Sequence, residues 1–488
     1  MKSVKTYVKD PFNAVLLYSF INIFLHYITI GRILPYMRSD IAFHIKLIYN
    51  EPLGKLLSTP YFAFYATLLP LKMLFDQETV YQIAGLLVFV NLLLIVAVYV
   101  FLKKLFSSTF SAVFGTLMLF SGNLACIPIL SSLFIGRYIL SSYDAYRQFE
   151  VLMFNSRYNI TSYIVLQYVP FVLSLTTICF MMACLLTSNF DKARLLSTFF
   201  IICYVYLVHP LYVLLLHIFL MLSIFMATFF SDANFSLSYR DISRVTQFMI
   251  IAGFILLFNA YLGNATFTYK LQLLMFLMIN IIMSLFLLFL GKKLGFILRI
   301  INSLSTFSLS LYRYLFFLAI LLLWMFSLCK VLSMEDFNAW EIIDQPTPIW
   351  LYPMIIGVGP LIISGVLICI QNRSVHNVSW LYLLLPLIFV IAAPLSDFVN
   401  FYILGYKNLN GYLLYSGVTS GRMLAIANLL YNIGSGVVMG YSMEKTNNFQ
   451  VSFLIGTSVL ILLLALTLVL SLDYWRVIYK ITLGTNNI

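Results

Sequence analysis

Long apolar runs separated by short polar intervals are the feature that most constrains this chain. The first run extends from about Phe12 to Ile30. A helix needs about 20 apolar residues to cross a bilayer, so this run is long enough to span. Of the 488 residues, 62% are hydrophobic and 9% are charged, and no water-soluble core could bury that much apolar surface. The pattern predicts an all-α polytopic membrane protein, a single transmembrane domain over residues 1–488 with about eleven to fourteen transmembrane helices.

Basic residues before the first run place the N-terminus in the cytoplasm, and the pair Lys103–Lys104 marks the same side at the end of the second span. Within the first outer loop, Tyr61–Phe75 is apolar, follows Pro60 and is short for a full span, so it is predicted as a re-entrant or surface-lying helix. Counting spans from the N-terminus places three polar intervals outside: residues 32–79, 136–161 and 396–422.

The other apolar runs predict further spans, with a turn at His209 and Pro210 between two of them. Positive charge beside spans and anionic lipid explains the net charge of +12, so no nucleic-acid partner is expected. The main predicted spans are Val80–Leu102, Phe110–Leu133, Ser162–Leu186, a pair within Leu195–Phe230, Tyr314–Leu328, Trp350–Ile370, Ser379–Ala393, Met423–Met443 and Val451–Leu472.

The polar stretch Ser39–Ser58 carries the first candidate site. It is predicted as an interfacial helix capped by Ser39, with Asp40 and His44 together on its wet side because they are four residues apart. The alternative is an ordinary amphipathic loop helix that Asp40 caps while pairing with His44. In either case another face of this helix is apolar, with Ile41, Ile45 and Ile48.

The basic residues that this topology places outside are concentrated in the first two outer loops. Basic residues usually favour the cytoplasmic side, so their presence outside needs a physical explanation. One reason is a bound anion such as a lipid-linked phosphate or pyrophosphate, which Arg can hold with two parallel hydrogen bonds. The other is an inverted topology. The candidate anion-binding residues in these loops are Lys46, Arg137, Arg147 and Arg157, beside Arg32, Arg38, Lys55 and Lys72.

Three further residues are candidates, each with a plainer interpretation. Asp144 is a natural second acid, or it pairs with Arg147 at helical spacing. His209 lines the site, or it is a helix-end residue before Pro210. Arg422 holds a lipid phosphate, or its side chain extends to the lipid headgroups. The chain has no P-loop, G-x-G-x-x-G or H-E-x-x-H motif, which argues against nucleotide-driven transport and a zinc protease.

Three segments together resemble the GT-C class of integral membrane glycosyltransferases, which includes protein mannosyltransferases, aminoarabinose transferases and oligosaccharyltransferases. They read SDIAFHIKLI, STPYFAFYATLLPLKMLF and GLLVFVNLLLIVAVYVFLKKLFSSTFSAVFGTLMLF. The resemblance covers roughly residues 12–135, with weaker support from HPL at 209–211.

This resemblance implies a sugar donor linked to polyprenyl phosphate or pyrophosphate, and a glycan, lipid or protein acceptor on the extracytoplasmic face of the plasma membrane. The family's first-loop acid, which activates the acceptor or helps to bind a metal, matches Asp40. Many members carry two nearby acids there, whereas Asp40 is followed by Ile41. That departure puts a divalent cation such as Mg or Mn in doubt and makes His44 a candidate substitute ligand or orienting partner.

Two alternatives to a transferase stay open. A transporter or flippase of lipid-linked glycan would place ionisable residues or helix breaks at mid-membrane, often in matched halves. A surface-polysaccharide polymerase or ligase would use a late polar loop, for which residues 396–422 qualify. The distinctive charges lie in predicted loops and no internal repeat is evident, which favours the enzyme.

Overall fold

The computed structural model shows α-helices and short 3-10 helices, and it contains no strand in the part of the chain that it describes. The prediction of an all-α fold is confirmed for these residues. They are 12–27, 40–57, 62–119, 169–186, 192–208, 212–229, 239–262, 270, 273–274, 276–290, 292, 310–332, 348–357, 359–370, 372–398, 402 and 420–445.

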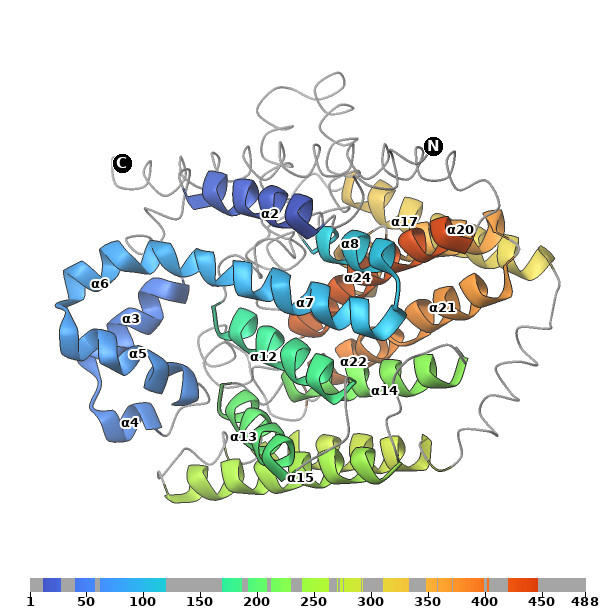
Figure 1. Ribbon diagram of the computed structural model, residues 1–488. Coiled ribbons are helices and arrows are strands. Elements are labelled where there is room, and N and C mark those ends of the chain that lie inside the picture. Colours follow the sequence, from blue (N-terminus) through green and yellow to red (C-terminus); the bar gives the residue numbers. More distant parts are fainter. Residues whose placement is uncertain are drawn as a thin grey trace, which may run out of the picture. The chain divides into compact units, whose positions relative to one another are not determined.

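The chain divides into two units, each with its own internal packing. Figure 1 labels their helices in chain order. Unit 1 consists of Met1–Ala112 and Val165–Thr306, and unit 2 consists of Val113–Ile164 and Phe307–Ile488. The helix α8, Thr109–Leu117, contains the first division point. Each unit is therefore assembled from two separate stretches of sequence.

Unit 1 begins with one helix, continues through several short helices and then forms a set of longer ones. A further helix in this unit, Phe276–Leu290, is apolar along its length. The elements are α2 (Phe12–His26), α3 (Asp40–Asn50), α4 (Leu53–Leu57), α5 (Phe62–Leu74), α6 (Gln77–Ala84), the 3-10 helix η3 (Gly85–Val90), α7 (Asn91–Phe106), α12 (Val169–Leu185), α13 (Lys192–Val208), α14 (Val213–Phe229) and α15 (Tyr239–Leu262).

Helix α7 contacts α2, α12 and α14. Leu94, Val98, Leu102 and Leu105 are buried along it, and their spacing of three or four residues produces one continuous apolar stripe. The predicted second span corresponds to α6, η3 and α7 in succession. Its helical part therefore extends beyond the predicted Val80–Leu102 at both ends.

Helix α7 ends just after the basic pair, as the sequence indicated. Ser107 adopts a left-handed conformation with φ of 52°, and its backbone N–H donates to the carbonyl of Lys103 at 3.0 Å. The cations Lys103 and Lys104 lie in the last turn, where the helix dipole favours positive charge. Because Ser107 is not glycine, this left-handed stop carries a conformational cost that the closing hydrogen bond partly offsets.

Unit 2 is organised around α24. This helix contacts α19, α20, α21 and α22, while α17 packs on α19 and α20. A Cβ atom added at Gly359 would lie 2.9 Å from the backbone oxygen of Tyr431, so α20 approaches α24 more closely than a larger residue allows. The elements are α17 (Ser310–Leu332), the 3-10 helix η6 (Ile349–Leu351), α19 (Tyr352–Ile356), α20 (Gly359–Cys369), α21 (Arg373–Leu384), α22 (Leu387–Asp397) and α24 (Ser420–Lys445).

The sequence predicts one span over Trp350–Ile370, but the structure breaks this segment at Gly357. Gly357 has a φ of 79°, a conformation that residues with a side chain rarely adopt. The Asn428 amide nitrogen donates to the carbonyls of Ile355 at 3.0 Å and Ile356 at 2.8 Å. The two carbonyls just before the break therefore receive their hydrogen bonds from a residue of α24, more than 70 residues later in the chain.

Two described helices, Tyr239–Leu262 and Arg373–Asp397, are long and apolar enough to cross a membrane. Other described apolar helices are 10–17 residues long, among them Phe12–Ile21, Pro170–Leu185 and Val213–Met226. By length and composition alone, two such helices are weak evidence of a membrane protein. The count of eleven to fourteen spans stays a prediction.

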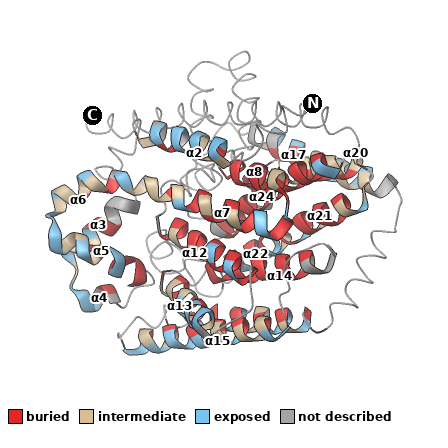
Figure 2. Cartoon of the chain, in the orientation of Figure 1, coloured by how far each residue is buried: buried red, intermediate tan, exposed pale blue. Residues whose placement is uncertain are grey.

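Figure 2 shows helix α15, one of these two helices, with buried and exposed residues alternating along its length. Its exposed side carries Ile251, Phe254 and Phe258, at spacings of three and four residues. Thr246 is buried, and its hydroxyl donates to the carbonyl of Ile242 at 3.0 Å. The exposed side of this helix is thus apolar, and its buried side carries Thr246 among residues that are otherwise apolar.

Candidate functional site

Asp40 is the first residue of α3, in the segment of short helices between α2 and α7. A carboxylate in the first turn of a helix interacts favourably with the helix dipole. Helix α3 contacts α4, α5 and α6, so neighbouring short helices hold it in place. The predicted cap, Ser39, lies outside the described residues.

His44 is buried, at 4% exposure, and not on the wet side of α3 as predicted. Its Nδ1 lies 2.9 Å from the Tyr65 hydroxyl of α5, and the edge of its ring meets Phe64 at 5.2 Å between centroids. The prediction was wrong because α5 covers this face and supplies a hydrogen-bond partner. Ile45 and Ile48 are buried as expected.

The cations of this segment have different positions. Lys46 is exposed, as an anion-binding residue requires. The Lys72 ammonium group donates to the carbonyls of Ile48 at 2.7 Å and Tyr49 at 3.5 Å and lies 5.9 Å from the centre of the Tyr49 ring. Lys72 therefore closes the C-terminal end of α3, a role that depends on α5 packing beside α3.

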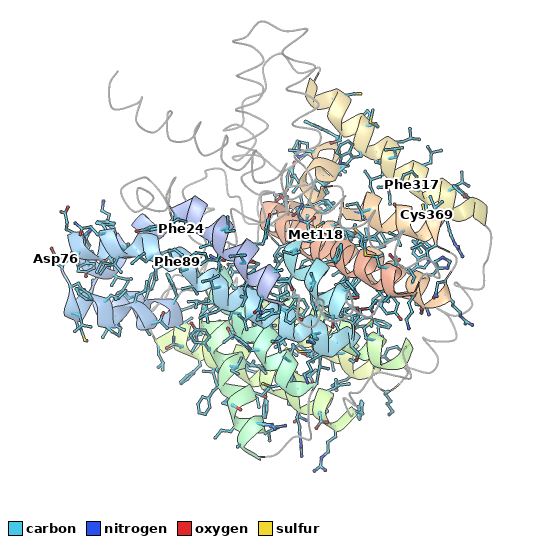
Figure 3. The ribbon with its side chains drawn as sticks, turned by 45° about the horizontal axis from the view of Figure 1, so that its top comes forward. Phe24, Asp76, Phe89, Met118, Phe317 and Cys369 are labelled. Atoms are coloured by element: carbon cyan, nitrogen blue, oxygen red, sulfur yellow. The ribbon has the colours of Figure 1, made fainter. Side chains whose placement is uncertain are left out.

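A carboxylate occupies the corner between α5 and α6. Figure 3 shows Asp76 at this corner, where its Oδ1 accepts the backbone N–H of Thr79 at 3.2 Å. Hydrogen bonds from the Thr79 hydroxyl and then from its N–H lower the pKa of Asp76. Burial, followed by the charge of Asp76, raises the pKa of Tyr49, whose hydroxyl donates to the carbonyl of Phe75 at 2.7 Å. These bonds connect the end of α3 to the α5–α6 corner.

The remaining predicted site residues lie on other helices or outside the described residues. Arg422 belongs to the first turn of α24, in unit 2. Lys55 belongs to α4. The others lie outside the described residues: Arg32, Arg38, Arg137, Asp144, Arg147, Arg157 and His209.

Removing the Tyr65 hydroxyl tests how α3 is held. Tyr65→Phe should lower the free energy of unfolding by about 1 kcal/mol, because a buried hydrogen bond to His44 is lost. Tyr81→Phe is the matched control, since the Tyr81 hydroxyl accepts from Gln77 at 3.1 Å in a more exposed place. Thermal unfolding of both purified variants measures the difference. Equal melting temperatures for the two variants would contradict this role for Tyr65.

His217 is a buried imidazole in the interior of unit 1 that the sequence analysis did not select. Its Nδ1 donates to the carbonyl of Val213 at 2.9 Å, and its Nε2 lies 3.2 Å from the Ser284 hydroxyl. Asn280 lies four residues before Ser284 and is also buried. Its side-chain amide donates to the carbonyl of Met249 at 2.9 Å. The sequence did contain a signal for His217, because an ionisable residue within an apolar run marks a candidate functional position.

Asp397, at the end of α22, is also a residue that sequence reasoning missed. It is 4% exposed, although it falls in an interval predicted as an outer loop. Its Oδ1 accepts the backbone N–H of Ser420, the first residue of α24, at 3.3 Å. The sequence could not show this burial, because an acid after an apolar run also marks an ordinary helix end.

No cluster of three or more His, Cys, Asp or Glu side chains suited to a metal ion occurs among the described residues. No protein-family model, curated protein or solved structure matches the chain.

Proposed function

We propose that this chain is a polytopic membrane glycosyltransferase of the GT-C type. It transfers a sugar from a polyprenyl phosphate or pyrophosphate donor to an acceptor on the outer face of the plasma membrane, with its N-terminus in the cytoplasm. The observation that carries the proposal is the position of Asp40 at the start of α3, among the short helices that follow the first apolar helix.

The distribution of polarity supports a membrane location. Large apolar side chains are exposed on α15, on α17 and on the helix Phe276–Leu290, for example Phe258, Leu322 and Ile282. The buried side chains of unit 1 include His217 and Asn280. Lipid chains accept an apolar surface without cost, whereas polar groups need partners inside the protein.

Asp40 would act as the general base. An acceptor hydroxyl is a weak nucleophile, and a carboxylate that takes its proton assists attack on the anomeric carbon of the donor sugar. The bond from this carbon to the phosphate oxygen then breaks, and the phosphate leaves on its lipid. Lys46, an exposed cation six residues later on the same helix, is open to a lipid-linked phosphate, but helical spacing puts it on a different side of α3 from Asp40.

His44 would position α3 rather than transfer a proton. Its buried ring is held by Tyr65 and lies one helical turn after Asp40. This contact, with the closure of the other end of α3 by Lys72, fixes the helix that begins at Asp40. Catalytic carboxylates work best when the surrounding structure restricts their geometry.

A transporter or flippase of lipid-linked glycan is the second candidate, and two observations favour it. His217 is an ionisable residue buried in an apolar interior, and the helix break at Gly357 interrupts an apolar segment. Transporters place substrate and ion sites at such features. In this case the chain would move its substrate without forming a glycosidic bond.

Proteoliposomes that contain the purified chain distinguish the two functions. The probes are undecaprenyl-phosphate mannose and undecaprenyl-phosphate glucose with a labelled sugar, supplied together with a membrane extract as acceptor. A transferase moves the label into a new covalent product. A flippase makes the labelled lipid accessible on the opposite leaflet and forms no such product, and this result would overturn the transferase proposal.

A further inference from the structure

The N-terminal ends of α17 and α21 lie together in unit 2. Nη1 of Arg313, in the first turn of α17, lies 3.2 Å from Nε2 of His376, in the first turn of α21. About one turn further along each helix, the rings of Phe316 and Trp380 are 5.4 Å apart between their centres. Both residues of the second contact come later in their helices, so α17 and α21 run in the same direction.

The imidazole of His376 is already engaged by the end of α20. His376 is 7% exposed, and its Nε2 is hydrogen-bonded to the carbonyl of Ile370, the residue that follows α20. A carbonyl can only accept a hydrogen bond, so Nε2 carries the hydrogen and donates it. The same nitrogen cannot also accept an N–H from Arg313. The contact between Arg313 and His376 therefore places two donors side by side.

The half-buried guanidinium group of Arg313 thus has no acceptor in the part of the chain that the structure describes. The first N–H groups of α21 do not share this need, because Oδ1 of Asn372 accepts those of Ser374 at 3.0 Å and Val375 at 3.4 Å. A guanidinium group presents its donors as a planar fork that matches two oxygens of a phosphate. A phosphate therefore fits the donors at this corner of unit 2.

The position of this corner along the predicted spans indicates where such a phosphate comes from. The helix Arg373–Asp397 is long and apolar enough to cross a membrane, and its C-terminal end adjoins the interval 396–422, which is predicted outside. In this topology its N-terminal end lies on the cytoplasmic side, where the leaflet carries anionic lipids. Beyond Arg313, α17 exposes Leu318 and Leu322 on a different side of the helix, which suits contact with lipid chains.

We propose that Arg313 binds the phosphate of an anionic phospholipid of the cytoplasmic leaflet. Two N–H groups of the guanidinium donate to two phosphate oxygens, while His376 stays bonded to Ile370 and keeps the start of α21 beside the end of α20. The site rests on the membrane location in the proposed function and not on sugar transfer. It is separate from the polyprenyl donor, which belongs to the outer face.

Native mass spectrometry of the purified full-length chain in detergent tests the site. The probes are dioleoylphosphatidylglycerol, which is anionic, dioleoylphosphatidylcholine, which has the same phosphodiester without net charge, and inorganic phosphate. The wild type should bind phosphatidylglycerol more tightly than phosphatidylcholine, and excess inorganic phosphate should not displace it. Arg313→Gln should raise the Kd for phosphatidylglycerol about tenfold, because a charged pair of hydrogen bonds is lost.

Arg240→Gln is the matched control. Arg240 is an exposed arginine in the first turn of α15, the other described helix that is long enough to cross a membrane. This variant should bind phosphatidylglycerol like the wild type. An equal loss of affinity in both glutamine variants would overturn the site and leave only general attraction to anionic lipid. Wild-type affinity in Arg313→Gln would also overturn it, since water then satisfies the guanidinium group.

Two further results bear on the ligand and on folding. Displacement of phosphatidylglycerol by inorganic phosphate would overturn the lipid as the ligand and leave a site for a free anion. Arg313→Lys keeps the charge but loses the fork of N–H groups, so it should weaken binding several-fold. If Arg313→Gln lowers the melting temperature, Arg313→Lys decides, and wild-type affinity in that variant would overturn the site.

The lipid site and the transferase proposal fail in different ways. Asp40→Asn should stop transfer but bind phosphatidylglycerol like the wild type if both are correct. Preferential binding of phosphatidylglycerol by a wild-type protein that forms no transfer product overturns the transferase alone. Transfer that depends on Asp40, without preference for phosphatidylglycerol over phosphatidylcholine, overturns the lipid site alone.

Discussion

Asp40→Asn is expected to lower the rate of sugar transfer by about a hundredfold or more while the protein stays folded. Asparagine has nearly the shape of aspartate and is favourable at the start of a helix, so α3 should form normally. Its amide cannot accept the proton of the acceptor hydroxyl. Initial rates with undecaprenyl-phosphate mannose or glucose in proteoliposomes measure the loss.

Glu78→Gln is the control for this prediction. Glu78 is an exposed acid in the first turn of α6, so the substitution removes the same charge in the same part of unit 1. Its rate should equal that of the wild type. Transfer by Asp40→Asn at the wild-type rate, with an unchanged melting temperature, would exclude Asp40 as the base.

Gly436→Ala is expected to destabilise unit 2 by about 3 kcal/mol, because the new methyl group has no room. A Cβ atom added at Gly436 would overlap the backbone oxygen of Phe114 and lie 2.6 Å from its backbone carbonyl carbon. Backbone atoms cannot rotate away as the end of a flexible side chain can. Helix α24 would have to move away from Phe114, and thermal unfolding in detergent should show a lower melting temperature.

Gly365→Ala, in α20 of the same unit, is the matched control. Among the described residues, the atom within 4 Å of a Cβ added there is Cε2 of Phe317, at 4.0 Å. Figure 3 shows Phe317 on α17, the helix that packs against α20. Alanine also favours a helix more than glycine, so this variant should be as stable as the wild type or slightly more stable. Similar melting temperatures for the two alanine variants would contradict the close approach at Gly436.

Several elements could be predicted from local sequence. The Pro-led run was expected to be helical over Tyr61–Phe75, and α5 covers Phe62–Leu74. The helix before the basic pair ends beside Lys103 and Lys104, as expected. Helix α13 ends at Val208 and α14 begins at Val213, on either side of the expected turn at His209 and Pro210. These features depend on residues close together in the chain, so run length and turn residues indicate them.

The candidate site was predictable only in part. Helical spacing placed Asp40 and His44 on one face of α3, but spacing carries no information about which helix covers that face. Tyr65 lies 21 residues after His44, and its position decided that the imidazole is buried. The closing of α3 by Lys72 depends in the same way on a residue 24 positions after Ile48.

The sequence by itself determined the all-α class and the position of many helices, because apolar run length and helix-end residues act locally. Only the tertiary structure decided that His44 and Asp397 are buried and that the segment Trp350–Ile370 breaks at Gly357. In each case the stabilising partner is remote in the chain: Tyr65 for His44, Ser420 for Asp397, and Asn428 for the carbonyls before Gly357. Folding brings each of these buried polar groups a hydrogen-bond partner from a distant part of the chain, and no local sequence pattern specifies that contact.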